Sequence, residues 1–314
     1  MSQPSVRILS DAADVASVAA DRVVDAAVTA VAARGIFHLC TTGGSTPAAL
    51  YRALREPSRA ARMPWAQTQI WFGDDRFVSR TDPLSNLQPL DAQLLSPGPN
   101  GAASPLPPTA VHPWPTSETS ADTAVQAYLA ELRSVGVAHT AEGFPIFDLV
   151  LIGVGGDGHC LSVFPGSPLA LPDAPVADGV PAPTHIEPHV PRLSFSLGML
   201  AAAREVIALA PGAAKAAAVA RIFAETTPIA DAPAKGALLP HATWLLDRAS
   251  AATLSACRAL NERLGSELLG CLPPSHSYCM ARRRASLLIL MRTITCVQVK
   301  SLRTRSARGT QGSS

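Results

Sequence analysis

Residues 147–159 read FDLVLIGVGGDGH and give the clearest indication of the fold class. Its apolar part, 147–153, is too short for a typical helix and runs into glycines, which indicates a buried β-strand followed by a loop. The same succession occurs twice upstream, where the apolar segments 36–42 and 68–72 are each followed by a polar, glycine-bearing loop. Three strand-then-loop units of this kind predict a sheet whose strands are largely buried.

Helical patterns separate the expected strands. They cover residues 11–34, 48–54, 120–134 and 212–224, with Ser10 as the expected N-cap of the first helix. Further strands are expected at 192–197, 205–210 and 243–247 and a closing helix at 249–264, whereas 97–118 and 165–191 are rich in proline and read as long loops. Strands alternating with helices predict an α/β fold, with a mainly parallel sheet covered by helices on both faces. The polar loops should then converge at the carboxyl ends of the strands.

The composition is that of a globular protein. The 314 residues are 47% hydrophobic and 16% charged, and no apolar run reaches the roughly 20 residues that span a bilayer. The N-terminus has no signal-like apolar core, so we expect a cytoplasmic protein that binds no membrane. The six cysteines form no C-x-x-C pair, and no metal ligand set is expected.

The charge is distributed unevenly along the chain. No acidic residue follows Glu267, whereas eight Lys and Arg residues do, which leaves 18 basic and 24 acidic residues in the rest. A net-negative body is a poor electrostatic match for nucleic acid. We therefore expect a catalytic domain over residues 1–265 and, over 266–314, an atypical basic extension that is disordered or loosely attached.

The segment Gly43-Gly44-Ser45-Thr46-Pro47 follows the first of the three strands. Backbone N–H groups in a glycine turn that opens a helix form a cradle for anions, and the two hydroxyls add donors. No lysine follows the glycines, which excludes a Walker A loop, and Pro47 excludes a G-x-S-x-G nucleophile elbow. A helix start without any ligand is the alternative.

The segment from Gly153 to Gly158 matches G-x-G-x-x-G, which is typical of dinucleotide binding. Two details weaken that interpretation. The expected acidic residue, Asp178, falls inside a proline-rich loop, and His159 directly follows the last glycine. A histidine at a glycine-lined strand end is suited to act as a general base, with Asp157 to orient it.

Two basic residues follow other strands. Arg76, in Gly73-Asp74-Asp75-Arg76, is expected either to hold a phosphate or developing negative charge, or to pair with a neighbouring aspartate. Lys215 lies in the first turn of an alanine-rich helix, where a cation opposes the helix dipole unless an anion is near; a solvated lysine is the alternative. Arg192 and Asn86 are weaker candidates.

Taken together, these segments resemble the glucosamine-6-phosphate isomerase/6-phosphogluconolactonase family, in particular its lactonases. The resemblance covers roughly residues 5–265, and its most specific parts are WFGDDRFV (71–78) and GDGHCLSVFPGSP (156–168). It implies a modified Rossmann-like fold and a cofactor-free hydrolase that opens 6-phospho-D-glucono-1,5-lactone to 6-phosphogluconate in the oxidative pentose phosphate pathway. The implied partner is that phosphorylated sugar lactone, and functional association with glucose-6-phosphate dehydrogenase is left open.

The resemblance and the residues together give the expected site. The catalytic residues would be His159, Asp157 and Arg76, and the substrate-binding residues would be Gly43, Gly44, Ser45, Thr46, Asp74, Asn86, Gly155, Gly156, Arg192 and Lys215. His159 would activate a water, while Arg76 or N–H groups near Gly155 and Gly156 would stabilise the oxyanion. A deaminase or isomerase acting on amino-sugar phosphates, a non-catalytic sugar-phosphate-binding protein and a nicotinamide-dependent oxidoreductase are the alternatives.

Overall fold

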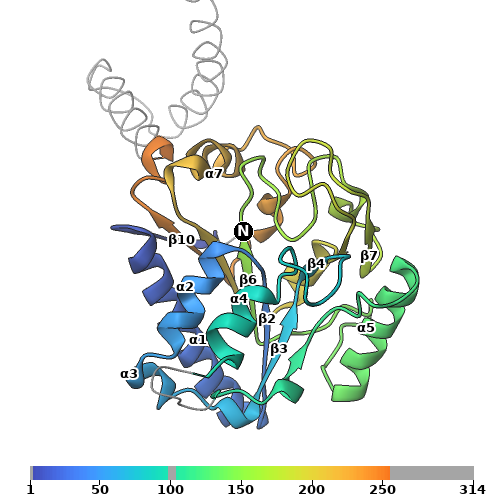
Figure 1. Ribbon diagram of the computed structural model, residues 1–314. Helices are drawn as coiled ribbons and strands as arrows, with labels where there is room; N and C mark the ends of the chain where they lie inside the picture. Colours follow the sequence, from blue (N-terminus) through green and yellow to red (C-terminus); the bar gives the residue numbers. More distant parts are fainter. Residues whose placement is uncertain (1–2, 98–103, 255–314) are drawn as a thin grey trace, which may run out of the picture. The chain divides into compact units, whose positions relative to one another are not determined.

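A computed structural model describes residues 3–97 and 104–254. Its centre is a seven-stranded sheet in which every neighbouring pair is parallel. From one edge to the other its strands are β1 (Ser5–Leu9), β10 (Ala242–Asp247), β9 (Val206–Ala210), β6 (Leu149–Gly153), β2 (Phe37–Thr41), β3 (Thr68–Phe72) and β5 (Val111–His112). The predicted parallel sheet is confirmed (Figure 1).

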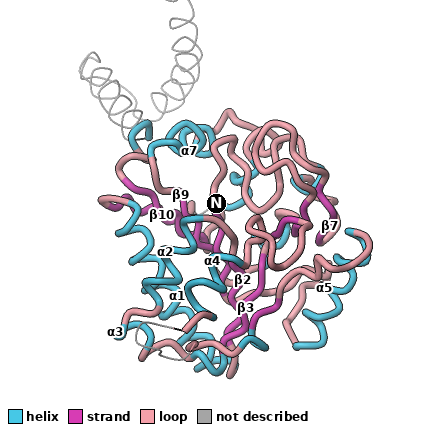
Figure 2. Tube along the Cα trace, viewed as in Figure 1, coloured by secondary structure: helices cyan, strands magenta, loops and turns pink. Residues whose placement is uncertain are grey.

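The central strands are buried along their whole length. Every residue of β2, β9 and β10 is buried, as parallel strands require when both faces of their sheet are covered. In Figure 2, α1 (Ala12–Arg34) and α2 (Ser45–Leu54) flank β2 and β3 on one side and α5 (Ala121–Val135) on the other. The hydroxyl of Tyr128 on α5 contacts the backbone of Phe72, which fixes that helix against the end of β3.

The first long helix begins one residue later than predicted. Asp11, not Ser10, is the N-cap of α1, because its carboxylate accepts hydrogen bonds from the N–H groups of Ala13 and Asp14. Gly35 ends the helix in the left-handed conformation, at φ 78°. Ala and Val side chains form the buried face of α1, but Val28 is 45% exposed and lies outside it.

A second, antiparallel sheet was not predicted. It contains β4 (Asp74–Arg76), β8 (Arg192–Phe195) and β7 (Ala177–Val180), in that order. Residues 73–76 were predicted as a loop and 165–191 as a proline-rich loop, yet they contribute β4 and β7 to this sheet. The short edge strands β1 and β5 were also missed, the latter within the predicted loop 97–118.

The remaining described helices are short: α3 (Pro57–Ala60), α4 (Gln88–Leu90), α6 (Gly198–Ala202) and α7 (Ala216–Phe223). No helix within residues 3–97 and 104–254 is long and apolar enough to cross a membrane. Three predictions fall on residues outside the described part of the chain. They are the basic extension 266–314, the boundary before it and most of the closing helix 249–264.

Candidate active site

The polar loops after β2 and β6 lie next to each other at the centre of the sheet. These strands are hydrogen-bonded neighbours although most of the intervening chain runs through β3 and β5 on one side of β2. The strand order therefore reverses between β2 and β6, and such a switch point opens a crevice at the carboxyl ends of the strands. The loop after β3 adjoins the same crevice, because β3 is the other neighbour of β2.

His159 and Asp157 form a close pair in the loop after β6. The Nδ1 of His159 lies 2.5 Å from Oδ1 of Asp157, and both side chains are less than one-fifth exposed. Because a carboxylate only accepts, Nδ1 donates its proton in this hydrogen bond, which leaves Nε2 as the nitrogen that can act as a general base. Burial alone would raise the pKa of Asp157, but the hydrogen bonds and charge of His159, with a further bond from His185, hold that pKa well below its ordinary value.

Gly155 makes room for this pair. A Cβ at this position would lie 2.0 Å from Nδ1 of His159 and 2.6 Å from Oδ1 of Asp157. The N–H of Gly155 donates to the carbonyl of His159 at 2.8 Å, which closes the loop. That N–H is therefore not available to an oxyanion, contrary to the prediction for Gly155. The N–H of Gly156 has no acceptor among the described residues.

The same loop disagrees with a dinucleotide fingerprint. No helix begins after Gly158; the chain instead forms an isolated bridge between Cys160 and Val163, with Leu161 at φ 55°. A fingerprint loop needs a helix N-terminus at this point to receive the pyrophosphate. The nicotinamide-dependent alternative has no structural support in this loop.

Arg76 and Arg192 face each other across the second sheet. They are register partners on the antiparallel strands β4 and β8. The guanidinium of Arg76 donates to the carbonyl of Leu84 at 2.6 Å and that of Arg192 to the carbonyl of Pro188 at 3.1 Å. Burial and the charge of Arg76 together lower the pKa of Arg192. Two cationic side chains at paired positions of neighbouring strands repel each other unless an anion lies between or beside them.

The predicted alternative for Arg76, an ion pair with Asp74 or Asp75, does not occur in the described structure. Asp74 is buried and accepts instead from the hydroxyl of Ser162 at 2.7 Å. Asp75 accepts from the backbone N–H groups of Arg76 and Asn86, both at 2.7 Å. Burial nevertheless raises the pKa of Asp75 to about 6. Both carboxylates therefore hold the loop together, and neither is free to contact a ligand.

Asn86 connects the loops after β2 and β3. Its amide nitrogen donates to the backbone carbonyl of Asp74 at 2.8 Å, and its Oδ1 occupies the space where a Cβ of Gly43 would be, at 1.9 Å. Gly43 is thus required for Asn86 to reach the crevice. The sequence ranked Asn86 as a weak candidate, yet it is 2% exposed and central to the site.

Three buried side-chain polar atoms in the described residues have no hydrogen-bond partner: Nε of Arg76, Oδ1 of Asn86 and Nε of Arg192. All three belong to predicted site residues. An orphaned buried donor or acceptor costs about 1–3 kcal/mol, so such atoms are rare. Two cationic donors and one neutral acceptor match a ligand that carries both an anionic group and hydroxyls.

The remaining predicted residues border the crevice. Gly44, at φ 99°, precedes α2, which begins at Ser45 and includes Thr46, and no side-chain cap bond is made at that position. Lys215 ends a short 3₁₀ turn, Ala213–Lys215, that abuts the histidine loop, since a Cβ on Gly156 would lie 4.0 Å from the carbonyl of Ala214. Lys215 forms no ion pair within the described chain.

His185 was missed by the sequence analysis. Its Nε2 lies 2.9 Å from Oδ2 of Asp157, so this carboxylate accepts from two histidines. The Phe164 ring packs 4.8 Å from the His159 ring and 5.6 Å from the His185 ring, and the Arg192 guanidinium lies 5.3 Å above it. Phe164 therefore ties the His159–Asp157 pair to Arg192. No sequence signal marks His185, because it lies in the proline-rich segment.

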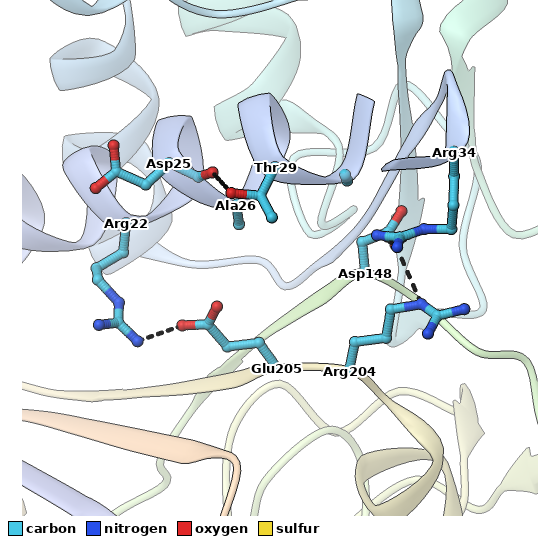
Figure 3. A pocket seen from close by; sticks show the side chains of 9 residues that line it. Arg22, Asp25, Ala26, Thr29, Arg34, Asp148, Arg204 and Glu205 are labelled. Atoms are coloured by element: carbon cyan, nitrogen blue, oxygen red, sulfur yellow. Dashed lines mark hydrogen bonds and ion pairs between the residues drawn. The ribbon is translucent and has the colours of Figure 1, made fainter. Parts of the chain in front are cut away.

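A hollow of about 420 Å³ lies at the amino-terminal ends of β6 and β9, at the other end of the strands from the crevice (Figure 3). Its charged side chains are all paired: Arg22 with Glu205 at 2.5 Å, Arg34 and Arg204 with Asp148 at 2.6 and 3.4 Å, and Asp25 with Arg62, outside the hollow, at 2.6 Å. The backbone N–H of His38 satisfies the other oxygen of Asp148. This hollow contains none of the orphaned atoms. We therefore place the candidate active site at the carboxyl ends of the strands.

The chain resembles known proteins over most of the described residues. A family described as glucosamine-6-phosphate isomerases/6-phosphogluconolactonase matches residues 10–245. A 6-phosphogluconolactonase of Streptomyces coelicolor is 35% identical over 80% of this chain and 95% of its own. A rabbit GDH/6PGL endoplasmic bifunctional protein is 37% identical over 60% of this chain but only 22% of its own. The structure of 6-phosphogluconolactonase from Trypanosoma brucei superposes with a TM-score of 0.70, at 26% identity, over 81% of this chain and all of that one.

Proposed function

Because the chain belongs to the glucosamine-6-phosphate isomerase/6-phosphogluconolactonase family, we propose that it hydrolyses 6-phospho-D-glucono-1,5-lactone to 6-phosphogluconate. One observation carries the proposal. A histidine base oriented by a carboxylate contacts the same Phe164 ring as Arg192, one of the three residues with orphaned atoms, and these atoms match a phosphorylated polyol. The His159 ring and the Arg192 guanidinium lie 4.8 and 5.3 Å from the same Phe164 ring. They are therefore close enough for the base and the anion site to contact one small ligand.

The phosphate is assigned to the two arginines. A phosphate dianion accepts hydrogen bonds from both Nε atoms and relieves the repulsion between Arg76 and Arg192. Lys215 and the N–H groups of the Gly43–Thr46 turn add positive potential at the same edge. Asn86 Oδ1 accepts from a sugar hydroxyl. These contacts position the ring, which converts a collision with water into a reaction of oriented groups.

The chemical step needs no covalent intermediate. Nε2 of His159 takes a proton from a water molecule as the water oxygen attacks the lactone carbonyl carbon. The N–H of Gly156 stabilises the resulting oxyanion, because it has no acceptor within the described chain. The carbonyl then re-forms, the bond to the ring oxygen breaks, and His159 returns the proton to that oxygen. Asp157 stabilises the imidazolium between the two transfers.

A deaminase or isomerase would need a free carboxylate base next to the substrate carbonyl. Asp74 is buried under Ser162 and Asn86, and Asp75 is held by backbone N–H groups. Neither is placed to take a proton from carbon, so the site favours lactone hydrolysis.

Association with a dehydrogenase is a further part of the proposal. The relative named GDH/6PGL endoplasmic bifunctional protein supports it only by its name, and this chain matches 22% of that protein. Pull-down of glucose-6-phosphate dehydrogenase by the full chain would support the association, and its absence at micromolar concentrations would contradict it.

The test is lactone hydrolysis by the full chain, with spontaneous opening subtracted. We expect turnover of the phosphorylated lactone, and His159→Ala should lower kcat about 100-fold or more. Near-normal turnover by a folded His159→Ala variant would contradict the role of the histidine. Release of ammonia from glucosamine 6-phosphate, without lactone turnover, would instead identify a deaminase.

A further inference from the structure

Asp157 is held from two sides by segments that are far apart in sequence. Its Oδ1 accepts from Nδ1 of His159, and its Oδ2 accepts from Nε2 of His185, which lies 28 positions further along the chain. Because a carboxylate can only accept, both ring nitrogens donate N–H groups to it. Oδ1 also accepts from the backbone N–H of His159 at 3.1 Å, and the bond from His185 holds the second oxygen, so the carboxylate cannot rotate about its Cβ–Cγ bond without breaking a bond.

The loop that carries His185 is fixed next to the site at other points. Nη2 of Arg192 donates to the carbonyl of Pro188, and His189 Nδ1 lies 2.6 Å from the carbonyl of Pro183. The His185 ring also packs at 90° against Phe164, the ring that both His159 and Arg192 contact. His185 is therefore placed by packing as well as by its bond to Asp157.

We propose that His185 is a positioning residue for the reaction: its Nε2–H fixes Oδ2 of Asp157 and so keeps Oδ1 aimed at Nδ1 of the base His159. This inference rests on the proposed lactonase function. It adds a third member, from the proline-rich segment, to the pair in the glycine loop. His185 does not touch the substrate in this scheme and acts only through Asp157.

The groups around this carboxylate set the expected pH effect. Asp157 faces His159 and His185. The Arg192 guanidinium lies 5.3 Å from the Phe164 ring that both histidines contact, and Arg221 donates to the backbone carbonyl of Asp157 at 3.3 Å. Loss of His185 removes one hydrogen bond that draws charge from the carboxylate. The remaining charge then acts more strongly on the His159 imidazolium and favours its protonated, inactive form.

The test compares His185→Ala, His185→Gln and a matched control, His189→Ala, in the full chain. His189 lies on the same loop and is exposed to the same extent, 48%, but it pairs with Glu187 rather than Asp157. We expect His185→Ala to lower kcat about 3- to 10-fold with little change in KM, and to move the acidic limb of the kcat/KM profile upward by roughly half a pH unit or more. His185→Gln, which keeps an N–H donor, should restore most of kcat. His189→Ala removes only contacts within the loop, to the Pro183 carbonyl and to Glu187. It should therefore lower kcat less than His185→Ala and leave the pH profile unchanged.

Three outcomes separate the possibilities. An inactive wild type overturns the proposed function, whatever the variants do. An active wild type with an unchanged pH profile in His185→Ala overturns the role of His185. Equal losses in His185→Ala and His189→Ala also overturn it, because they indicate a general disturbance of the loop. An NMR titration of the His159 ring, which needs no turnover, should show the same upward displacement in His185→Ala.

Discussion

Replacement of Arg192 by methionine distinguishes a ligand-binding arginine from a structural one. Methionine keeps an unbranched apolar side chain next to Phe164 but removes the guanidinium. If Arg192 were a structural residue with satisfied contacts, its removal would destabilise the fold by about 3–5 kcal/mol, as the loss of one member of a buried charged pair does. The structure predicts a much smaller effect.

The magnitude follows from the contacts of Arg192. The variant loses the hydrogen bond to Pro188 and the contact with the Phe164 ring, worth together about 2–4 kcal/mol. It gains by removing an orphaned buried Nε, about 1–3 kcal/mol, and the repulsion from Arg76 that it ends is offset by the lost attraction to Asp74 and Asp75. These contributions nearly cancel, so we expect the free energy of unfolding to change by less than about 1 kcal/mol.

Binding should change far more than stability. Loss of a charge-assisted hydrogen bond to phosphate costs about 1.5–3 kcal/mol, which corresponds to a roughly 10- to 150-fold rise in KM for the phosphorylated lactone. Turnover of unphosphorylated glucono-1,5-lactone should stay within about 2-fold of the wild type. Urea unfolding and steady-state kinetics measure the two effects separately. A loss of about 3 kcal/mol or more with an unchanged KM would refute the assignment of Arg192 to the phosphate.

Two further predictions concern the loops of the site. Gly155→Ala should lower kcat about 100-fold or more in steady-state assays, because its Cβ would displace His159; Gly153→Ala, whose Cβ meets nothing within 4 Å, is the matched control, and equal activities would contradict the explanation. Asp75 should make the protein less stable as the pH rises from about 4 to 6, because burial raises its pKa from 3.8 to about 6 and the native state binds the proton more tightly than the unfolded state. A difference of about two pKa units corresponds to roughly 3 kcal/mol in the free energy of unfolding. Asp75→Asn should flatten this part of the curve of stability against pH, measured by urea unfolding at each pH. An unchanged slope would be evidence against the raised pKa.

The parallel sheet could be predicted because its central strands carry their own signal. Residues 68–72 and 149–153 are short apolar runs that end at polar glycine loops, and burial on both faces requires such a composition. The second sheet carried no such signal. Its strand β4 is the charged triplet Asp74–Arg76 and β7 contains Gly179, so only their pairing with β8 makes them strands.

The site was predictable where one loop contains all its parts. His159, Asp157 and Gly155 lie within five residues, and local chemistry was enough to connect them. The juxtaposition of Arg76 with Arg192 and of Asp157 with His185 depends on tertiary pairing, which a single sequence does not display. Backbone bonding also escaped prediction: the N–H of Gly155 closes the loop instead of facing the ligand.

Buried charge is compensated at the amino-terminal ends of the strands but not at their carboxyl ends. At the edge before β6, Asp148 accepts from Arg34 and from the N–H of His38, so its charge is fully compensated without a ligand. At the carboxyl ends of β3 and β6, Arg76 and Arg192 are register partners on β4 and β8, and each has a buried donor without an acceptor in the described residues. Under the proposed function, we expect this unfavourable energy to be released when an anion binds, which would make binding selective for the phosphorylated lactone over its neutral analogue.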